Sequence, residues 1–152
     1  MAAYDKIAMH YAQRRKDTSR FDYNRDIEVP AMLSMLGDVK GKIILDLGCG
    51  FGDHAQQLAR RGAKKIIGFD SSKELIRLAE EQRIPRCVFE VGDMRQKLKF
   101  RSNYFHIVFS SMAIHYIKNL QRLFLEVRRV LKKGGIFVFS TGHPIFDLIN
   151  QS

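Results

Sequence analysis

Lys42-Ile-Ile-Leu-Asp-Leu-Gly-Cys-Gly-Phe-Gly-Asp53 is the stretch that decides the fold. Its apolar run, Ile43–Leu47, predicts a buried strand, and Asp53 begins a pattern typical of a helix. Three glycines lie between them, at positions 48, 50 and 52. Glycine lets the backbone turn sharply and approach a ligand where a Cβ would collide. The stretch therefore predicts a strand, a tight turn and a helix, with a ligand at the turn.

The glycine spacing argues against a dinucleotide. The turn reads G-x-G-x-G, and Asp53 stands where the fingerprint G-x-G-x-x-G requires its third glycine. Asp46 adds a negative charge two residues before the first glycine. A carboxylate there repels a pyrophosphate but attracts an ammonium group, so NAD and FAD are disfavoured.

Strand and helix signals alternate after residue 40. We expect strands at 43–47, 65–69, 87–91, 104–111 and 136–140, with amphipathic helices between them. One helix runs from Asp53 to a stop at Gly62, and a capping-box pattern at 71–74 opens the next. Another ends at Gly134-Gly135. Repeated strand–helix–strand units predict an α/β fold with a Rossmann-like, doubly wound parallel sheet of about five strands.

We expect one globular unit with two parts. Residues 1–40 are interpreted as a helical cap packed across the top of the sheet, with a polar loop from Thr18 to Arg25. Residues 41–152 form the ligand-binding domain.

Polar residues stand at the ends of the predicted strands, where ligands of open α/β sheets lie. Asp70 ends the second strand, and its carboxylate can accept two hydrogen bonds from a ribose diol. Asp93-Met94 follows the third strand, and this pair suits adenine, whose amino group donates while its face packs on a thioether. Ser110 and Ser111 end the fourth strand.

Four segments together resemble class I S-adenosylmethionine-dependent methyltransferases in order and spacing, and most closely the group that includes the ubiquinone- and menaquinone-biosynthesis enzymes. They are Leu45–Gly50, Gly68–Ser72, Gly92–Met94 and Leu131–Gly135. The resemblance spans about residues 40–145. The N-terminal pattern Tyr4-Asp5…Ala8…Tyr11…Arg14 is also similar to the cap of such enzymes.

The resemblance implies S-adenosylmethionine as cofactor and S-adenosylhomocysteine as product. The glycine backbone would face the methionine portion, Asp46 would receive its ammonium group, directly or through water, Asp70 would hold the ribose, and Asp93 and Met94 would contact adenine. The expected cofactor-binding residues are Tyr11, Arg14, Tyr23, Asp46, Gly48, Cys49, Gly50, Asp70, Ser71, Asp93, Met94, Ser110 and Ser111.

Catalytic residues are not fixed by any motif. His115, Tyr116 and His143 are substrate-side candidates, although His115 is also explained as a packed or solvated histidine. No metal-ligand spacing occurs, and Cys49 and Cys87 form no redox motif. No signal peptide or membrane-spanning run is present, which indicates a reduced, cytoplasmic protein without membrane contact.

Methyl transfer to a small-molecule acceptor is the expected function, and two alternatives stay open. The net charge of +10 admits an RNA methyltransferase, but a solvated basic surface is the favoured explanation of the charge. A non-catalytic cofactor-binding module, or a fragment without its substrate lid, would bind the cofactor and transfer nothing.

The C-terminus departs from the family. Similar enzymes continue past the fifth strand with a helix and two antiparallel strands, so we expect a chain truncated at its C-terminal end. An apolar strand at 136–140 would then lie at an open edge, which predicts self-association through that strand.

Overall fold

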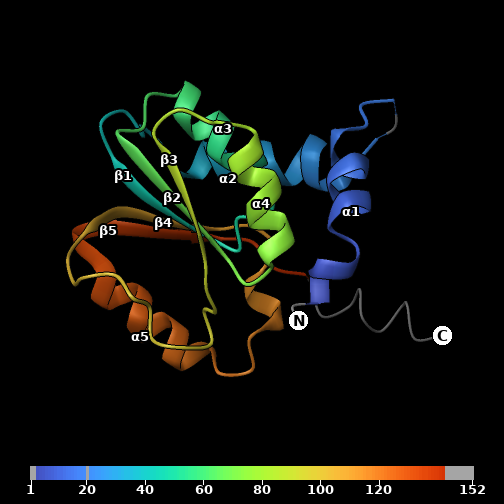
Figure 1. Ribbon diagram of the computed structural model, residues 1–152. Helices are drawn as coiled ribbons and strands as arrows, with labels where there is room; N and C mark the ends of the chain where they lie inside the picture. Colours follow the sequence, from blue (N-terminus) through green and yellow to red (C-terminus); the bar gives the residue numbers. More distant parts are fainter. Residues whose placement is uncertain (1–2, 20, 143–152) are drawn as a thin grey trace.

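The computed structural model describes residues 3–19 and 21–142, and its centre is one parallel sheet (Figure 1). The strands are β1 (Ile43–Leu47), β2 (Lys65–Asp70), β3 (Cys87–Val91), β4 (Phe105–Ser110) and β5 (Leu131–Phe139). Their order is β3-β2-β1-β4-β5, with every pair parallel. The predicted Rossmann-like α/β fold is confirmed. The order reverses between β1 and β4, which is where open sheets of this kind bind ligands.

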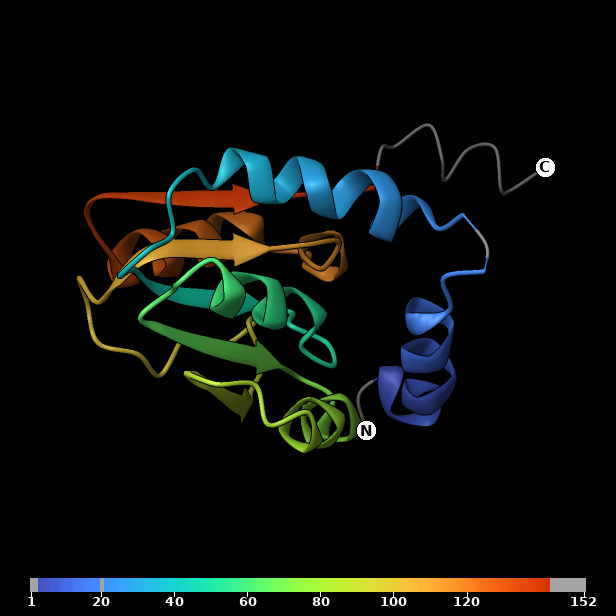
Figure 2. The same cartoon turned by 90° about the horizontal axis from the view of Figure 1, so that it is seen from above.

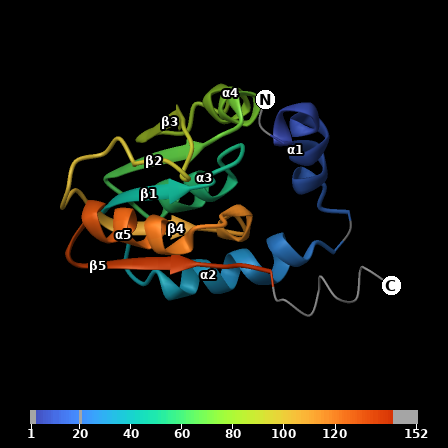
Figure 3. The same ribbon diagram turned by 90° about the horizontal axis from the view of Figure 1, so that it is seen from below.

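Helices cover both faces of the sheet (Figure 3). On one face α2 (Val29–Met35), α3 (Asp53–Arg60) and α4 (Lys73–Glu81) pack on Ile44 and Ile66, and on the other α5 (Leu120–Val130) packs on Leu45 and Leu47. Since successive strand residues point to opposite faces, a strand covered on both sides is expected to be mostly apolar, with Asp46 of β1 as an exception. Burial on both faces explains the apolar runs at the centre of the sheet.

The predicted cap of residues 1–40 divides into two parts. A 3-10 turn, η1 (Ala3–Lys6), and α1 (Ala8–Lys16) lie beyond the carboxyl ends of the strands, whereas α2 runs along the sheet (Figure 2). Between them a π-helical turn, η2 (Asn24–Glu28), begins inside the segment predicted as loop. Buried Met32, Leu33 and Leu36 place α2 in the core layer, so that only the first part is a cap.

Several element boundaries differ from the prediction, and the largest difference is that β5, expected at 136–140, spans Leu131–Phe139. The helix expected to continue to Gly134 ends at Val130, because Leu131 already pairs with Phe105 at the start of β5. Gly134, with φ +77°, lies in the irregular start of that strand. Ser72 caps α4, since its Oγ accepts a hydrogen bond from Leu75 N at 3.2 Å.

β5 lies at an edge of the sheet, with no described strand on its outer side. Its Ile136 is 39% exposed and its Phe139 is 40% exposed. Within the described residues no helix is both long and apolar enough to cross a bilayer.

Candidate functional site

The glycine turn after β1 forms the floor of the candidate site. Gly48 has φ +77°, and a Cβ built on it would lie 2.3 Å from the Cβ of Ala113, which follows β4. The amide of Gly48 donates to Phe69 O at 2.7 Å, so the turn is fastened to β2. Any side chain at position 48 would push the β1 and β4 loops apart.

Asp70, at the end of β2, ties two backbone segments together. Its Oδ2 accepts from Gly50 N at 3.0 Å, and its Oδ1 accepts from Ser72 N at 2.9 Å. Burial raises the pKa of this carboxyl, and the amides of Ser72 and Gly50 oppose that rise. Each carboxylate oxygen keeps a second lone pair for a ligand. The side chain thus fixes the turn and presents an acceptor to the space in front of it.

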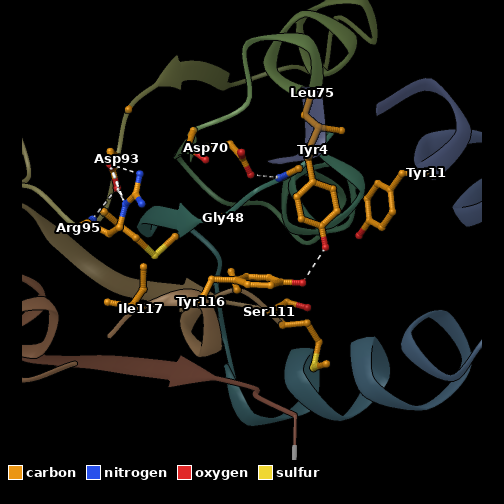
Figure 4. A pocket seen from close by; sticks show the side chains of 16 residues that line it. Tyr4, Tyr11, Gly48, Asp70, Leu75, Asp93, Arg95, Ser111, Tyr116 and Ile117 are labelled. Atoms are coloured by element: carbon orange, nitrogen blue, oxygen red, sulfur yellow. Dashed lines mark hydrogen bonds and ion pairs between the residues drawn. The ribbon is translucent and has the colours of Figure 1, made fainter. Parts of the chain in front are cut away.

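That space is a cavity of about 240 Å³ at the carboxyl ends of the strands (Figure 4). It is lined by residues from six parts of the chain: Tyr4, Tyr11, Gly48, Gly50, Asp70, Ser71, Leu75, Gly92, Asp93, Met94, Arg95, Ser111, Met112, Ala113, Tyr116 and Ile117. Apolar and aromatic walls with a few convergent polar groups are typical of small-molecule sites.

Asp93 is engaged by an arginine of its own loop. Arg95 Nε lies 2.9 Å from both carboxylate oxygens, and its backbone N–H donates to Oδ1 at 2.8 Å. These hydrogen bonds lower the pKa of Asp93, so its carboxylate stays ionised on one side of the cavity. A ligand amino group would have to share this carboxylate with the guanidinium.

The N-terminal segment closes one side of the cavity. Tyr4 Oη lies 3.0 Å from Tyr116 Oη, which joins the segment to the loop after β4 (Figure 4). Burial, followed by this hydrogen bond, raises the pKa of Tyr4, which keeps its hydroxyl protonated. Asp5 Oδ1 accepts from Ser72 Oγ at 2.6 Å. The segment is therefore held to both α4 and the β4 loop.

Arg15 provides a second attachment. Its guanidinium donates to Asp53 Oδ2 at 2.8 Å and to Asp22 Oδ1 at 3.0 Å, and its side chain is only 5% exposed. The pKa of Asp53 is lowered because the charges of His54 and Arg15 outweigh the burial of the carboxyl. This ion pair, buried on its arginine side, joins α1 to the first residue of α3, next to the glycine turn.

Asp46 lies behind the turn and does not line the cavity. It is fully buried, and neither carboxylate oxygen has a hydrogen-bond partner among the described groups. Burial raises its pKa to about 7, against a lowering by His54. Glu28 Oε2 and His54 Nε2 are also buried and unpartnered. Buried polar atoms without a described hydrogen-bond partner thus lie beneath the floor of the cavity.

The structure brings most of the predicted residues together. Nine of the sixteen line the cavity: Tyr11, Gly48, Gly50, Asp70, Ser71, Asp93, Met94, Ser111 and Tyr116. Six do not. Arg14 and His115 are exposed, Tyr23 is 61% exposed, and Asp46, Cys49 and Ser110 are buried behind the wall, where Ser110 Oγ donates to Leu47 O at 2.8 Å. His143 lies outside the described residues.

Other residues that line the cavity were not among the predicted site residues. Tyr4 was visible only as part of the N-terminal pattern, and Leu75 and Arg95 carried no motif. The helical face of α1 buries Arg15 and leaves Arg14 in solvent, which the spacing of charges alone did not indicate. Within residues 3–19 and 21–142 no cluster of His, Cys, Asp and Glu could hold a metal ion.

Comparison with protein families gives a direct match. The family model described as "Methyltransferase domain" matches residues 45–139, which run from β1 to the end of β5. The matched region contains the glycine turn, Asp70 and Asp93.

Similar proteins share this region. An uncharacterized protein of Haemophilus influenzae is 34% identical over 152 residues, which is 95% of this chain and 59% of the relative. The human arginine-hydroxylase NDUFAF5 is 28% identical over 91% of the chain and 41% of its own length. The malonyl-[acyl-carrier protein] O-methyltransferase of Hamiltonella defensa is 30% identical over 72% and 42%. The chain therefore spans about half the length of these relatives.

A crystal structure supports the same grouping. The S-adenosylmethionine-dependent methyltransferase of Mesorhizobium loti superposes with a TM-score of 0.75 at 35% identity, covering 82% of this chain and 56% of that one.

Proposed function

The chain belongs to the family of S-adenosylmethionine-dependent methyltransferases, and on that premise we propose that it transfers the methyl group of this cofactor to a small-molecule acceptor. The observation that carries the proposal is the cavity at the switch point of the sheet, which combines a side-chain-free floor with the buried carboxylate of Asp70. The cofactor supplies an activated methyl group, and the chain supplies alignment and exclusion of water.

The residues present fit the cofactor's parts. We propose that the free lone pairs of Asp70 accept the ribose hydroxyls, because a carboxylate held rigidly by two backbone amides loses little freedom on binding. Met94 and Ile117 supply apolar surface to the adenine. Gly48 and Gly50 leave room for the methionine portion. Ser71 and Tyr11 complete the wall.

Asp46 and Asp93 have less direct roles in cofactor binding than the motifs alone predict. Asp46 is shielded by the turn, so it acts on the ammonium group through the negative potential that it adds when ionised, or through an intervening water. Asp93 contributes a carboxylate already oriented by Arg95, and its role is to fix the loop beside the adenine as much as to accept a hydrogen bond.

The acceptor side is formed by hydroxyls. Ser111 and Tyr116 line the cavity, and Tyr116 is paired with Tyr4. We propose Tyr116 as the substrate-side group closest to the reaction, in preference to exposed His115. A dedicated base is needed only if the acceptor is protonated at neutral pH. The relative that is named for O-methylation of malonyl-[acyl-carrier protein] supports an oxygen acceptor such as a carboxylate.

Calorimetric titration with S-adenosylhomocysteine tests cofactor binding. We expect a dissociation constant below about 100 μM, and no binding of NAD, whose pyrophosphate is disfavoured beside Asp46 and Asp70. Equal affinity for the two ligands, or no heat with either in folded protein, would refute the cofactor assignment.

Transfer is tested with S-adenosylmethionine that carries a tritiated methyl group. The acceptors are a panel of small carboxylic acids and, separately, total RNA. Label in an acid supports the proposal. Label only in RNA replaces it with an RNA methyltransferase, and cofactor binding without label in any acceptor indicates a binding module.

A further inference from the structure

The excess positive charge of the chain is concentrated at one edge of the sheet. Because all five strands are parallel, the segments that lead into them meet at the amino edge, opposite the cofactor cavity (Figure 2). Segments 37–42, 61–65, 82–87, 99–104 and 131–135 contain eleven Lys and Arg residues and one carboxylate, Asp38. This difference equals the net charge of +10, so the other 15 Lys and Arg are balanced by 15 Asp and Glu.

The cations of this amino edge are almost all without a carboxylate partner. Lys99 pairs with Glu90 at 2.7 Å, and no other Lys or Arg of the five segments forms an ion pair with a described carboxylate. Eight of the eleven are exposed, and Lys42, Lys65 and Lys132 are partly covered. The exposed ones are Lys40, Arg61, Lys64, Arg83, Arg86, Lys99, Arg101 and Lys133, of which Arg61 donates to Leu33 O at 2.8 Å. Adjacent strands are about 4.8 Å apart, so the cations extend over about 20 Å.

A contact within this edge points to an anion. Ile43 N donates to His106 Nδ1 at 3.0 Å, so the neutral imidazole carries its proton on Nε2. Lys132 Nζ lies 3.0 Å from that same Nε2. Two N–H donors therefore converge with no described acceptor between them. An anionic oxygen beside them would accept from both. Burial and the charges of Lys132 and Lys42 lower the pKa of His106, in keeping with a ring held neutral among cations.

An aromatic hollow adjoins the cations. A depression of about 450 Å³ between α5 and the start of β5 is lined by Phe124, Phe137 and Leu131, with Arg128, Lys132 and Lys133 among its other lining residues. The two phenylalanine rings have centroids 5.9 Å apart, and Phe124 is 40% exposed. Cations that follow a backbone beside aromatic faces that stack bases are the combination by which proteins bind single-stranded nucleic acid.

From these features we propose that the amino edge is a docking surface for single-stranded nucleic acid. Phosphates lie along the cations that lead into the strands, and one base stacks in the hollow between α5 and β5. A protein partner is disfavoured because the cores of protein interfaces are depleted of charged residues, whereas nucleic-acid interfaces are polar and strongly positive. Strands of five or six residues separate this surface from the cofactor cavity by about 17–20 Å, so the docked segment is an anchor and not the methyl acceptor.

Fluorescence anisotropy of a labelled 20-nucleotide oligouridylate tests the proposal. We expect binding at 50 mM salt that weakens about 100-fold by 200 mM, as for about five phosphate contacts to a single strand. A duplex of equal length should bind at least tenfold more weakly, because its bases cannot stack in the hollow. Absence of binding at 50 mM salt, or a flat salt response, would overturn the proposal.

Matched charge reversals locate the surface. The double variant Lys64→Glu/Lys133→Glu should lose at least tenfold in affinity, and Lys6→Glu/Lys73→Glu, with the same change of charge at exposed positions outside the edge, should lose less than threefold. Phe124→Ala should weaken oligonucleotide binding without changing the dependence of the affinity on salt concentration. The reverse order of the two double variants would show the surface to be elsewhere.

Two further probes test whether the surface prefers another kind of anion to nucleic acid. Vesicles with 30% phosphatidylserine and a polyglutamate of 20 residues present anions without bases, and tighter binding of either one than of the oligonucleotide would overturn the assignment. S-adenosylhomocysteine affinity, measured on Lys64→Glu/Lys133→Glu and on Phe124→Ala, should stay within twofold of the parent. The experiments therefore test the docking surface and the methyl-transfer site independently of each other.

Discussion

Replacing the buried carboxyl of Asp46 by an amide should make the protein more stable at alkaline pH and not at acid pH. The side chain is fully buried, and both carboxylate oxygens lack a described partner. Burial raises the pKa of the folded protein's Asp46 to about 7 from a value of 3.8. Asp46→Asn keeps the shape of the group and removes its titration.

The direction of the stability change with pH follows from the number of protons bound in the folded and unfolded states. Between pH 3.8 and about 7 the folded state keeps a proton that the unfolded state has released, so the stability of the parent falls as the pH rises through this window. The full shift corresponds to about 4 kcal/mol, and the part between pH 5 and pH 8 to about 3 kcal/mol. The amide variant has no such loss. Its stability relative to the parent should therefore rise by about 3 kcal/mol from pH 5 to pH 8.

Urea unfolding at the two pH values measures this difference. Asp38→Asn, at an exposed position, serves as a control for removal of one carboxylate from the net charge. The reasoning fails if Asp46→Asn changes the free energy of unfolding equally at pH 5 and pH 8. Such a result would mean that a partner inside the folded protein compensates the buried charge.

Three further changes test the site and the sheet edge. Asp70→Asn retains one oxygen acceptor and should weaken S-adenosylhomocysteine at least tenfold by calorimetry, at about 1.5–3 kcal/mol for a charge-assisted hydrogen bond; unchanged affinity in a folded variant contradicts the ribose assignment. Gly48→Ala should lower the thermal midpoint by several degrees and reduce cofactor affinity, because its Cβ would lie 2.3 Å from Ala113; a variant as stable as the parent shows that the loops can move apart. Self-association through the outer side of β5 predicts concentration-dependent sedimentation that Ile136→Lys reduces, and a parent that stays monomeric at micromolar concentration removes this proposal.

The sheet was predictable because its strands are short, apolar and separated by helical patterns. Burial on both faces leaves a continuous signal in the sequence, and β1 was placed at its observed bounds. Asp70 and Asp93 were found for the same reason: the end of a parallel strand fixes the edge at which the next residue lies.

The closure of the cavity was not predictable in this way. Tyr4 and Tyr116 are 112 residues apart, and no local pattern indicates that their hydroxyls meet. Whether Arg14 or Arg15 is buried depends on the rotation of α1 against α4, and adjacent helix positions differ by about 100°. The pairing of Arg95 with Asp93 depends on the turn that follows β3.

The unbalanced cations lie at the amino ends of the strands, whereas the charges of the rest of the chain balance one another, so the net positive charge is displaced toward one end of the sheet and gives the molecule an electric dipole. A protein with such a dipole orients in a field and on a charged support before any contact is made. On a cation-exchange matrix or a mica surface it should settle with the ends of Lys64 and Lys133 against the support and the cavity toward the solution. Protein adsorbed in this way would keep its cofactor entrance open, so that binding could be measured on a surface without a tag or a tether.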